Sequence, residues 1–399
     1  MRLKRITLVC MALSSAPAAA LAQSTVQIYG TANVDVESVG ATGSATGTNF
    51  PSRTRVTSNS SNLGFRGTED LGSGLDAWFQ IESAVNFDSG ATSGFLASRN
   101  SGVGLRNQWG QILLGQWDSP YKFSTLRLDP TGDTGIAAYT GILGGTGSIT
   151  AGQGGANFAE RASFDRRVSN VVQYWTPSWN GVSGRLAYGA TDTNLGSAAT
   201  GVPEGAGLRP QLFSAMGAYE NGPIYATLAY EQHKDFEPMN ILLGAPVSHG
   251  RDDAFKAGLS YAVNEAFTLG AIFERLRYRA DDINALGSLE RKVNDWYLVG
   301  NYKIWPHAFA LSYGQKGDEK LSGAGFSDLP DSKAHQISAR YGYSLSKRTQ
   351  LYAVATRITN GSNAFQTFGN SPITPTSLFR DPARGADVSG VGLGIIHSF

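Results

Sequence analysis

The segment 118–166 carries the side chains best placed to act on a solute, because it is the longest stretch without a strand pattern and long ordered loops are usually functional. Its acids include Asp118, Asp129 and Asp133. Carboxylates on such a loop, facing a basic wall, would set up a transverse field that a polar or ionic solute can exploit. The alternative is that these acids pair with neighbouring bases and only hold the loop in place.

Basic residues in the polar phase of the predicted strands are the candidates for that wall. They are Arg66, Arg106, Arg167 and Arg185, with Arg340 as a further candidate. We expect these side chains to face the loop across a narrow aqueous gap.

Four aromatic residues lie in or beside the same segment: Trp117, Tyr121, Phe123 and Tyr139. They could line a path for sugars, since sugar rings slide over aromatic faces, or they could pack the loop against its support. We favour packing.

Catalytic and metal-binding patterns are missing from the sequence. The five histidines show neither an HExxH motif nor a Cys/His spacing typical of metal sites, and Cys10 is the only cysteine. No Gly-rich stretch follows a strand and opens a helix. We therefore expect no enzymatic activity and no cofactor.

The composition of the 399 residues narrows the class of protein. A mean hydropathy of −0.19 is too polar for a helical membrane protein, and 11% aromatic residues are too many for a disordered chain. The formal net charge of +1 offers no electrostatic support for nucleic-acid binding. Forty-nine glycines and only 16% charged residues favour an all-β chain.

Residues 1–22 have the pattern of a secretory signal peptide. Three basic residues within the first five precede an apolar run, which ends in a small-x-small signature at Ala22. We predict cleavage after Ala22 and an exported mature chain, 23–399, that contains no cysteine.

Alternation of apolar and polar residues dominates the mature chain. It is clear in 25–38, 74–87, 223–231 and 253–263. Seven short turns alternate strictly with eight long polar segments, which are 39–60, 88–97, 118–166, 191–209, 235–251, 279–291, 317–333 and 360–386.

This arrangement predicts a 16-stranded antiparallel transmembrane β-barrel, with short periplasmic turns at one end and long extracellular loops at the other. The barrel must close, because lipid offers no partner to unpaired backbone groups. The apolar phase should then face lipid and the polar phase should line a lumen. Trp109, Trp179 and Trp305 fall in the short turns, where an interfacial aromatic belt belongs. The final alternation, 391–399, should pair with the first strand.

Several motifs resemble those of the Gram-negative general porins of the β-proteobacterial type. The stretch SNLGFRGTEDLGSGL at 61–75 resembles their second-hairpin motif, QIYG at 27–30 their first strand, and GIIHSF at 394–399 their last. The resemblance covers essentially the whole mature chain. In one place it fails: the family often has Arg after the glycine that ends strand five, whereas Gln116 follows Gly115 here. The selectivity therefore does not follow from the resemblance.

The resemblance implies a homotrimer whose third external loop, 118–166, folds into the pore as a constriction. It also implies that the barrel-assembly machinery reads the C-terminal signal, His397 and Phe399. We predict an outer-membrane protein in contact with lipid and lipopolysaccharide that passes small hydrophilic solutes and ions by passive diffusion. The alternatives are a channel specific for a sugar or a carboxylate, and a surface-recognition barrel (an adhesin) that uses loops such as 39–60 or 360–386.

Overall fold

A computed structural model describes residues 25–90 apart from 46 and 48, 96–145, 164–189, 210–235, 250–281, 287–369 apart from 324 and 326, 371, 373 and 384–399. The predicted signal peptide, 1–22, lies outside the described residues. So do parts of seven of the eight predicted long loops and the whole of the eighth, 191–209.

Nearly all of the described secondary structure is β-strand. The first nine strands are β1 (Thr25–Thr42), β2 (Phe50–Ser58), β3 (Asn62–Asp70), β4 (Asp76–Ala84), β5 (Ser101–Asn107), β6 (Gly110–Asp118), β7 (Arg167–Trp175), β8 (Val182–Gly189) and β9 (Gln211–Asn221). The other nine are β10 (Ile224–Lys234), β11 (Arg251–Ala262), β12 (Phe267–Ala280), β13 (Leu289–Ile304), β14 (His307–Lys316), β15 (Lys320–Gly323), β16 (Ala334–Ser344), β17 (Thr349–Asn360) and β18 (Asp387–Ser398).

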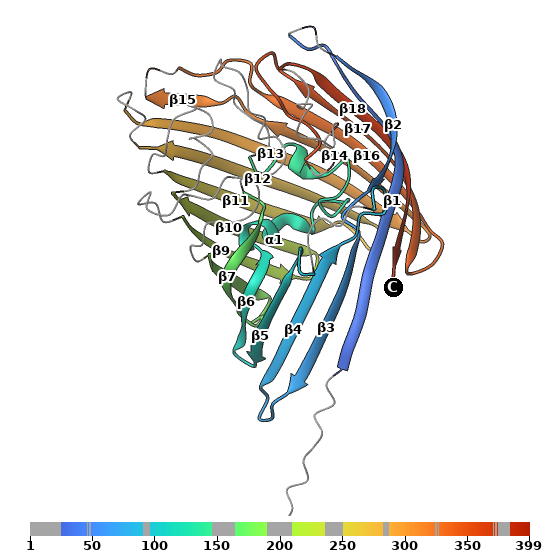
Figure 1. The fold of residues 1–399 in the computed structure, drawn as a ribbon, viewed down its shortest axis with the longest axis vertical. Coiled ribbons are helices and arrows are strands. Elements are labelled where there is room, and N and C mark those ends of the chain that lie inside the picture. Colours follow the sequence, from blue (N-terminus) through green and yellow to red (C-terminus); the bar gives the residue numbers. More distant parts are fainter. Residues whose placement is uncertain are drawn as a thin grey trace, which may run out of the picture.

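These segments form a closed barrel of sixteen antiparallel strands (Figure 1). Both β2 and β3 pair with β1, and both β14 and β15 pair with β13, so each pair of segments is one interrupted strand. The ring closes between β1 and β18, whose register runs from Thr31 opposite Ser398 to Thr42 opposite Asp387. The predicted strand number and the predicted pairing of the last strand with the first are both confirmed.

The apolar phase of the strands faces outward, as predicted. Val36 on β1 and Leu393 on β18 are register partners and are 52% and 68% exposed. The neighbouring Asp35, in the polar phase, is only 2% exposed because it points into the barrel. A wall that shows Val and Leu to its surroundings and carboxylates to its interior suits a bilayer outside and water inside.

Tryptophans mark the end of the barrel where the turns are short. Trp109, Trp179 and Trp305 lie in these turns and are largely exposed. Indole rings prefer the boundary between hydrocarbon and headgroups, so this end of the wall has the predicted aromatic belt.

The predicted loop 39–60 is wrong in its bounds. β1 continues to Thr42 and β2 starts at Phe50, so that only a short connection remains. The outward phase of β2 contains Ser52 and Thr54, and its inward Arg55 forms an ion pair with Glu37 at 2.6 Å. Val56 is the one apolar residue in this outward phase, so the strand lacks the repeated apolar positions that reveal a lipid-facing strand. In the same way, β15 lies within the predicted loop 317–333.

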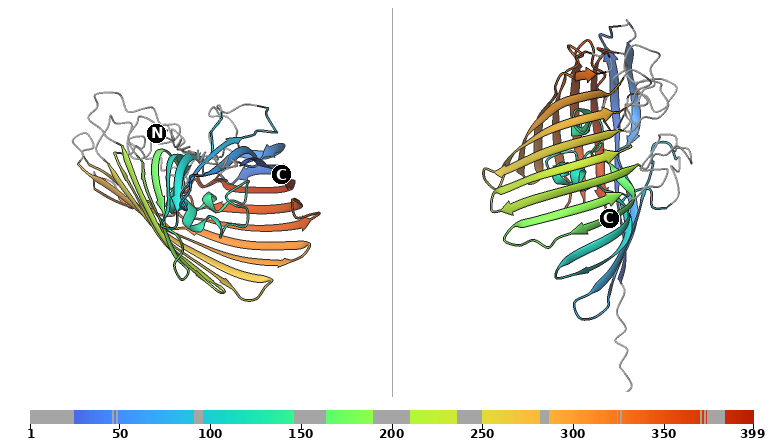
Figure 2. Two further views of the ribbon diagram at one scale, coloured as in Figure 1. Left: turned by 90° about the horizontal axis from the view of Figure 1, so that it is seen from below. Right: turned by 90° about the vertical axis from the view of Figure 1, so that its left-hand side faces the viewer.

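Residues 118–166 are called the inner loop here, and the described part of this loop lies inside the barrel, as Figure 1 and the left view of Figure 2 show. Of this loop, 118–145 and 164–166 are described. It contains α1 (Pro120–Leu126) and a 3-10 turn, η1 (Tyr139–Gly141). The Ser119 side chain caps α1 by accepting a hydrogen bond from the Lys122 backbone N–H. In the described part of the chain, no helix has the length and apolar character needed to cross a membrane.

Apolar packing holds the inner loop against the wall. Leu128, Ile136, Ile142 and Leu143 are buried in one cluster with residues of β1, β12, β13, β17 and β18. The lumen-facing side of the wall is thus apolar where the loop covers it and polar elsewhere. The alternation of residues within one strand does not show where this change occurs.

Candidate functional site

A buried ion pair fixes the end of the inner loop. The ammonium of Lys256 on β11 lies 2.6 and 2.5 Å from the two carboxylate oxygens of Asp165 and 3.2 Å from Glu274 on β12. Glu274 also accepts hydrogen bonds from the Tyr121 hydroxyl at 2.7 Å and from the Gly144 backbone N–H at 2.6 Å. One buried cluster therefore joins three points of the loop to two strands.

Asp129 organises the middle of the loop. Its carboxylate accepts hydrogen bonds from the backbone N–H groups of Thr131 at 2.8 Å, Asp133 at 3.2 Å and Tyr139 at 2.9 Å. Burial raises its pKa to about 6, against the lowering effect of these hydrogen bonds. This side chain shapes the loop and does not project into the lumen.

The other two predicted loop acids are also buried and paired. Asp133 accepts from the Lys122 ammonium at 2.7 Å and from the Thr140 hydroxyl at 2.5 Å. Asp118 lies 3.3 Å from Arg167 and accepts from the Asn100 amide at 2.8 Å. The geometry of all three acids favours the alternative in which they pair with neighbouring groups and hold the loop in place. It does not favour a row of acids that faces a basic wall across the lumen.

The pairs continue around the wall as one belt of three ion pairs and one further guanidinium group. We call it the charge belt: Lys122, Asp133, Asp118, Arg167, Arg99, Glu82 and Arg66. In its wall part, Arg99 is 2.6 Å from Glu82, which accepts from the Tyr29 hydroxyl at 3.0 Å. The guanidinium of Arg66 lies 4.9 Å from the centre of the Tyr29 ring. The belt holds one more base than acids.

The predicted arginines differ in whether a carboxylate neutralises them. Arg106 and Arg167 are paired, with Asp76 at 2.8 Å and with Asp118. Arg66 instead donates to the Gln27 side chain at 2.9 Å and has no carboxylate partner among the described residues.

Arg340 and Arg185 also have no carboxylate partner in the part of the chain that the structure covers. Arg340 donates to Gln350 at 2.8 Å and lies over the Tyr352 ring. The guanidinium carbon of Arg185 is 3.3 Å from the centre of the Phe123 ring and 3.9 Å from that of Trp175.

The aromatic residues of the segment divide into two groups. Tyr121 and Tyr139 are fully buried, which agrees with packing. Phe123 is 38% exposed toward the lumen. Trp117 packs edge-on against Trp78 on β4 and Trp175 on β7, with ring centres 5.8 and 5.6 Å apart.

Sequence reasoning missed several members of the site. Lys122, Glu82 and Asn100 were not predicted, although each is bound directly to a predicted or neighbouring charge. Arg127, which contacts Glu220 at 2.8 and 2.9 Å, was missed as well. The usable signal was the position of Lys122 and Arg127 inside the predicted constriction loop.

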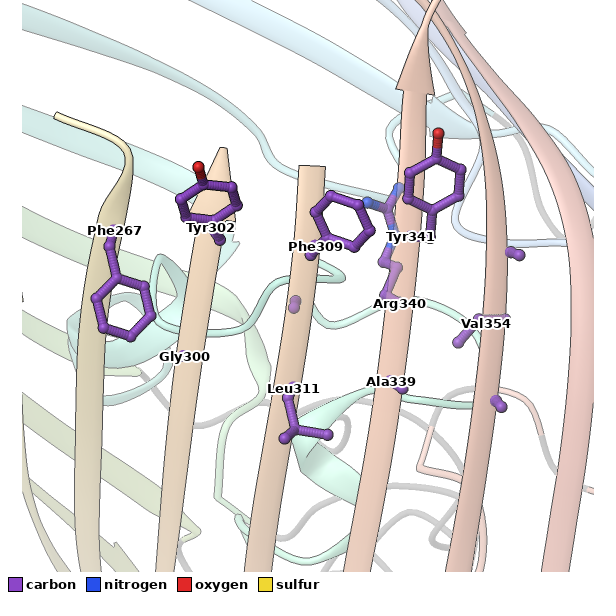
Figure 3. Close-up of a pocket in the computed structure, with 12 residues that line it drawn as sticks. Phe267, Gly300, Tyr302, Phe309, Leu311, Ala339, Arg340, Tyr341 and Val354 are labelled. Carbon is purple, nitrogen blue, oxygen red and sulfur yellow. The ribbon is translucent and has the colours of Figure 1, made fainter. Parts of the chain in front are cut away.

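A separate hollow of about 670 Å³ lies on the outer face of β12 to β17 (Figure 3). It is bordered by Tyr302, Phe309 and Leu311, which are exposed, and by Tyr341. Its floor is formed by small residues such as Gly300 and Ala339. This hollow belongs to the lipid-facing surface and not to the lumen.

The C-terminal residues lie at the seam that closes the barrel. Phe399 and Gly30 exchange backbone hydrogen bonds of 3.0 and 3.2 Å, and His397 shares one of 2.8 Å with the Thr349 hydroxyl. Among the described residues, no group of three His, Cys, Asp or Glu side chains is arranged to hold a metal ion.

Comparisons with known proteins agree with the barrel. The model of the Gram-negative porin family matches residues 7–363. Outer membrane porin protein 32 of Delftia acidovorans is 29% identical, over 98% of this chain and 99% of that protein. An outer membrane porin protein of Bordetella pertussis is 28% identical, over 86% of this chain and 83% of that protein.

A solved structure has the same architecture over the same length. An anion-selective porin from Comamonas acidovorans superimposes with a TM-score of 0.74 at 26% identity, covering 94% of this chain and all of that one. Because the family model spans most of the sequence, the chain belongs to the Gram-negative porin family and is an outer-membrane porin, a channel for passive diffusion.

Proposed function

We propose that the channel prefers anions among small hydrophilic solutes. The observation that carries this proposal is the uneven pairing of charges in the lumen. Arg66, Arg185 and Arg340 have no carboxylate partner among the described residues, whereas Asp118, Asp129 and Asp133 are buried and bound. An aqueous gap bordered by unpaired guanidinium groups attracts anions and raises their local concentration.

The pore-constriction roles are assigned accordingly. Arg66 and Arg340 act directly on the solute, and Arg185 acts at the short-turn end of the lumen. Arg106 and Arg167 contribute less because a carboxylate neutralises each of them. The selectivity stated for the Comamonas acidovorans porin supports this direction.

The reversal potential in planar bilayers, measured across a roughly tenfold KCl gradient, tests the proposal. We expect the reversal potential of the wild-type channel to have the sign of chloride selectivity. In Arg66→Gln and in Arg340→Gln, the reversal potential should shift toward zero. Arg357→Gln is the matched control, because Arg357 lies on the outer face of β17 and pairs with Asp387. A wild-type channel that prefers potassium would overturn the proposal.

The assembled state follows from the same family resemblance. We propose a homotrimer embedded among outer-membrane lipid and lipopolysaccharide, inserted by the barrel-assembly machinery through His397 and Phe399. Its proposed role is transport alone, without catalysis. Native mass spectrometry of the detergent-extracted protein tests the trimer, and a monomeric mass would contradict it.

A channel specific for a carboxylate is the second candidate that an observation favours. Aromatic rings border Arg185, which has no carboxylate partner among the described residues, and a general anion filter does not require such rings. Liposome swelling separates this candidate from an adhesin, because a recognition barrel whose lumen is plugged passes no small solute.

A further inference from the structure

The lumen has a hollow below the inner loop, at the end with the short turns. Its volume is about 740 Å³, and it is bordered by turn residues such as Asn107 and Ser178 and by Phe123 of α1. A second hollow of about 290 Å³ adjoins it and shares Arg106, Gln111 and Trp175. We call the two together the lower vestibule. A volume of this size is typical of sites for small organic molecules.

Arg185 is the central charge of the lower vestibule. The rings of Phe123 and Trp175 contact its guanidinium group, and no hydrogen bond or ion pair to it occurs among the described residues. Stacked aromatic rings cover the flat face of a guanidinium but leave the N–H groups at its edge available. The protein thus holds a planar donor edge in place without satisfying it.

The other bases of the larger hollow are already satisfied. Arg127 stacks on Tyr225 at 4.2 Å and is bound through both nitrogens by Glu220. Arg106 is bound by Asp76. An anion that enters the larger hollow therefore finds Arg185 as the base without a described carboxylate partner.

Aromatic surface continues from Arg185 into the smaller hollow. Trp175 borders both hollows, and Trp78 and Trp117 border the smaller one. The three indole rings form one cluster, with centres 5.6, 5.8 and 6.5 Å apart. Arg66 also borders the smaller hollow; it donates to Gln27 and has no carboxylate partner among the described residues. Trp117 is buried and Trp78 and Trp175 are half-buried, so the hollow is bordered by an aromatic wall that is packed in place.

We propose that the lower vestibule binds planar aromatic carboxylates on their way through the channel. The carboxylate would take two parallel hydrogen bonds from the edge of Arg185, and the ring would lie against Phe123 or Trp175. Chloride or acetate engages the charge alone, and a saturated ring cannot stack flat. The inference rests on the proposed anion preference, because a channel that repels anions would not deliver this ligand.

Block of the chloride current in planar bilayers tests the inference with benzoate and cyclohexanecarboxylate as probes. The two acids have the same charge and similar size, but only benzoate is planar and aromatic. We expect benzoate, added on the side of the short turns, to reduce the current with a dissociation constant about fivefold lower than that of cyclohexanecarboxylate.

Three variants separate the parts of the site. Arg185→Gln should weaken block by both acids, whereas Trp175→Leu and Phe123→Leu should remove the preference for benzoate and keep the sign of the reversal potential. Trp109→Leu is the matched control, since Trp109 is an exposed turn residue outside the lower vestibule, and it should behave as wild type. Because Phe123 belongs to the inner loop and Trp175 to the wall, folding failure of one variant leaves the other to decide.

Equal block by the two acids in the wild type would overturn the inference and leave the anion preference intact. Retained benzoate preference in both Trp175→Leu and Phe123→Leu would also overturn it. A reversal potential of the cationic sign would instead contradict the proposed function, whatever benzoate does.

Discussion

Lys256 on β11 binds both carboxylate oxygens of Asp165 with a fully buried ammonium group, at the point where the inner loop returns to the wall. A buried charge left without its partner is strongly destabilising, while the neutral replacement of both partners is tolerated.

We therefore predict that Lys256→Met detaches this end of the inner loop. The expected cost is about 3–5 kcal/mol of local stability, together with a larger and noisier single-channel conductance. The triple variant Lys256→Met with Asp165→Asn and Glu274→Gln, which removes all three buried charges, should recover most of the wild-type conductance. Equal conductance in the wild type and in Lys256→Met would show that the loop is held by its apolar contacts alone.

Two substitutions in the wall part of the charge belt should shift the reversal potential in opposite directions. Arg99→Gln should shift the reversal potential toward cations, since Glu82 then lacks its partner at 2.6 Å. Glu82→Gln should shift it toward anions. Both shifts should be larger at about 0.1 M salt than at about 1 M, where the Debye length is shorter. Two shifts of the same sign would contradict the belt.

The closing seam depends on a glycine. A Cβ atom at Gly30 would lie 2.5 Å from the Phe399 ring and 2.6 Å from the Asn62 carbonyl oxygen. We predict that Gly30→Val sharply lowers the yield of folded barrel, measured by the heat-modifiable band on gels. Gly217→Val on β9 is the matched control, because no atom lies within 4 Å of its added Cβ. Equal yields for the two variants would show that the seam tolerates the added side chain.

Asp129 gives the stability a pH dependence of known sign. Its pKa in the native protein is about 6, above the usual value of 3.8, so between these values the native state binds the proton more tightly than the unfolded state. The contribution of this group to the free energy of unfolding therefore falls as the pH rises through this window, by roughly 3 kcal/mol at most.

Urea unfolding in detergent, at intervals from about pH 4 to about pH 7, measures this effect. We expect the free energy of unfolding of the wild type, relative to that of Asp129→Asn, to be highest at the acid end of this range and to fall as the pH rises. Asp88→Asn, at an exposed loop position, is the matched control for the loss of a loop carboxylate. A pH-independent difference for Asp129→Asn would contradict the assigned pKa.

The strands could be predicted from the sequence because the bilayer constrains one phase of each strand. Val36 and Leu393 are apolar because they face lipid, so the alternation of apolar and polar residues directly indicates the strands of the wall. β2 could not be predicted in this way because its outward phase is polar apart from Val56. Its assignment needed the pairing with β1, which no pattern within 50–58 contains.

The lumen was predicted less well because its charges depend on contacts between distant segments. Lys256 and Asp165 are 91 positions apart, and nothing in either segment shows that they meet. Arg106 seemed a free pore charge, but the register of β4 and β5 places Asp76 opposite it. A long loop separates these strands, so their register could not be read from a turn. Polar phase thus indicated which residues face inward, but not which of them remain unpaired.

The outward apolar phase and the aqueous lumen are the basis of every assignment above, and single cysteines test them directly. The only cysteine, Cys10, lies in the predicted signal peptide, so the mature chain provides a clean background. Gln80 borders the smaller hollow of the lower vestibule, whereas Val103 on the adjacent strand is exposed on the outer face. A charged methanethiosulfonate reagent should lower the single-channel conductance of Gln80→Cys and leave that of Val103→Cys unchanged. Modification of Val103→Cys with no effect on Gln80→Cys would contradict the account.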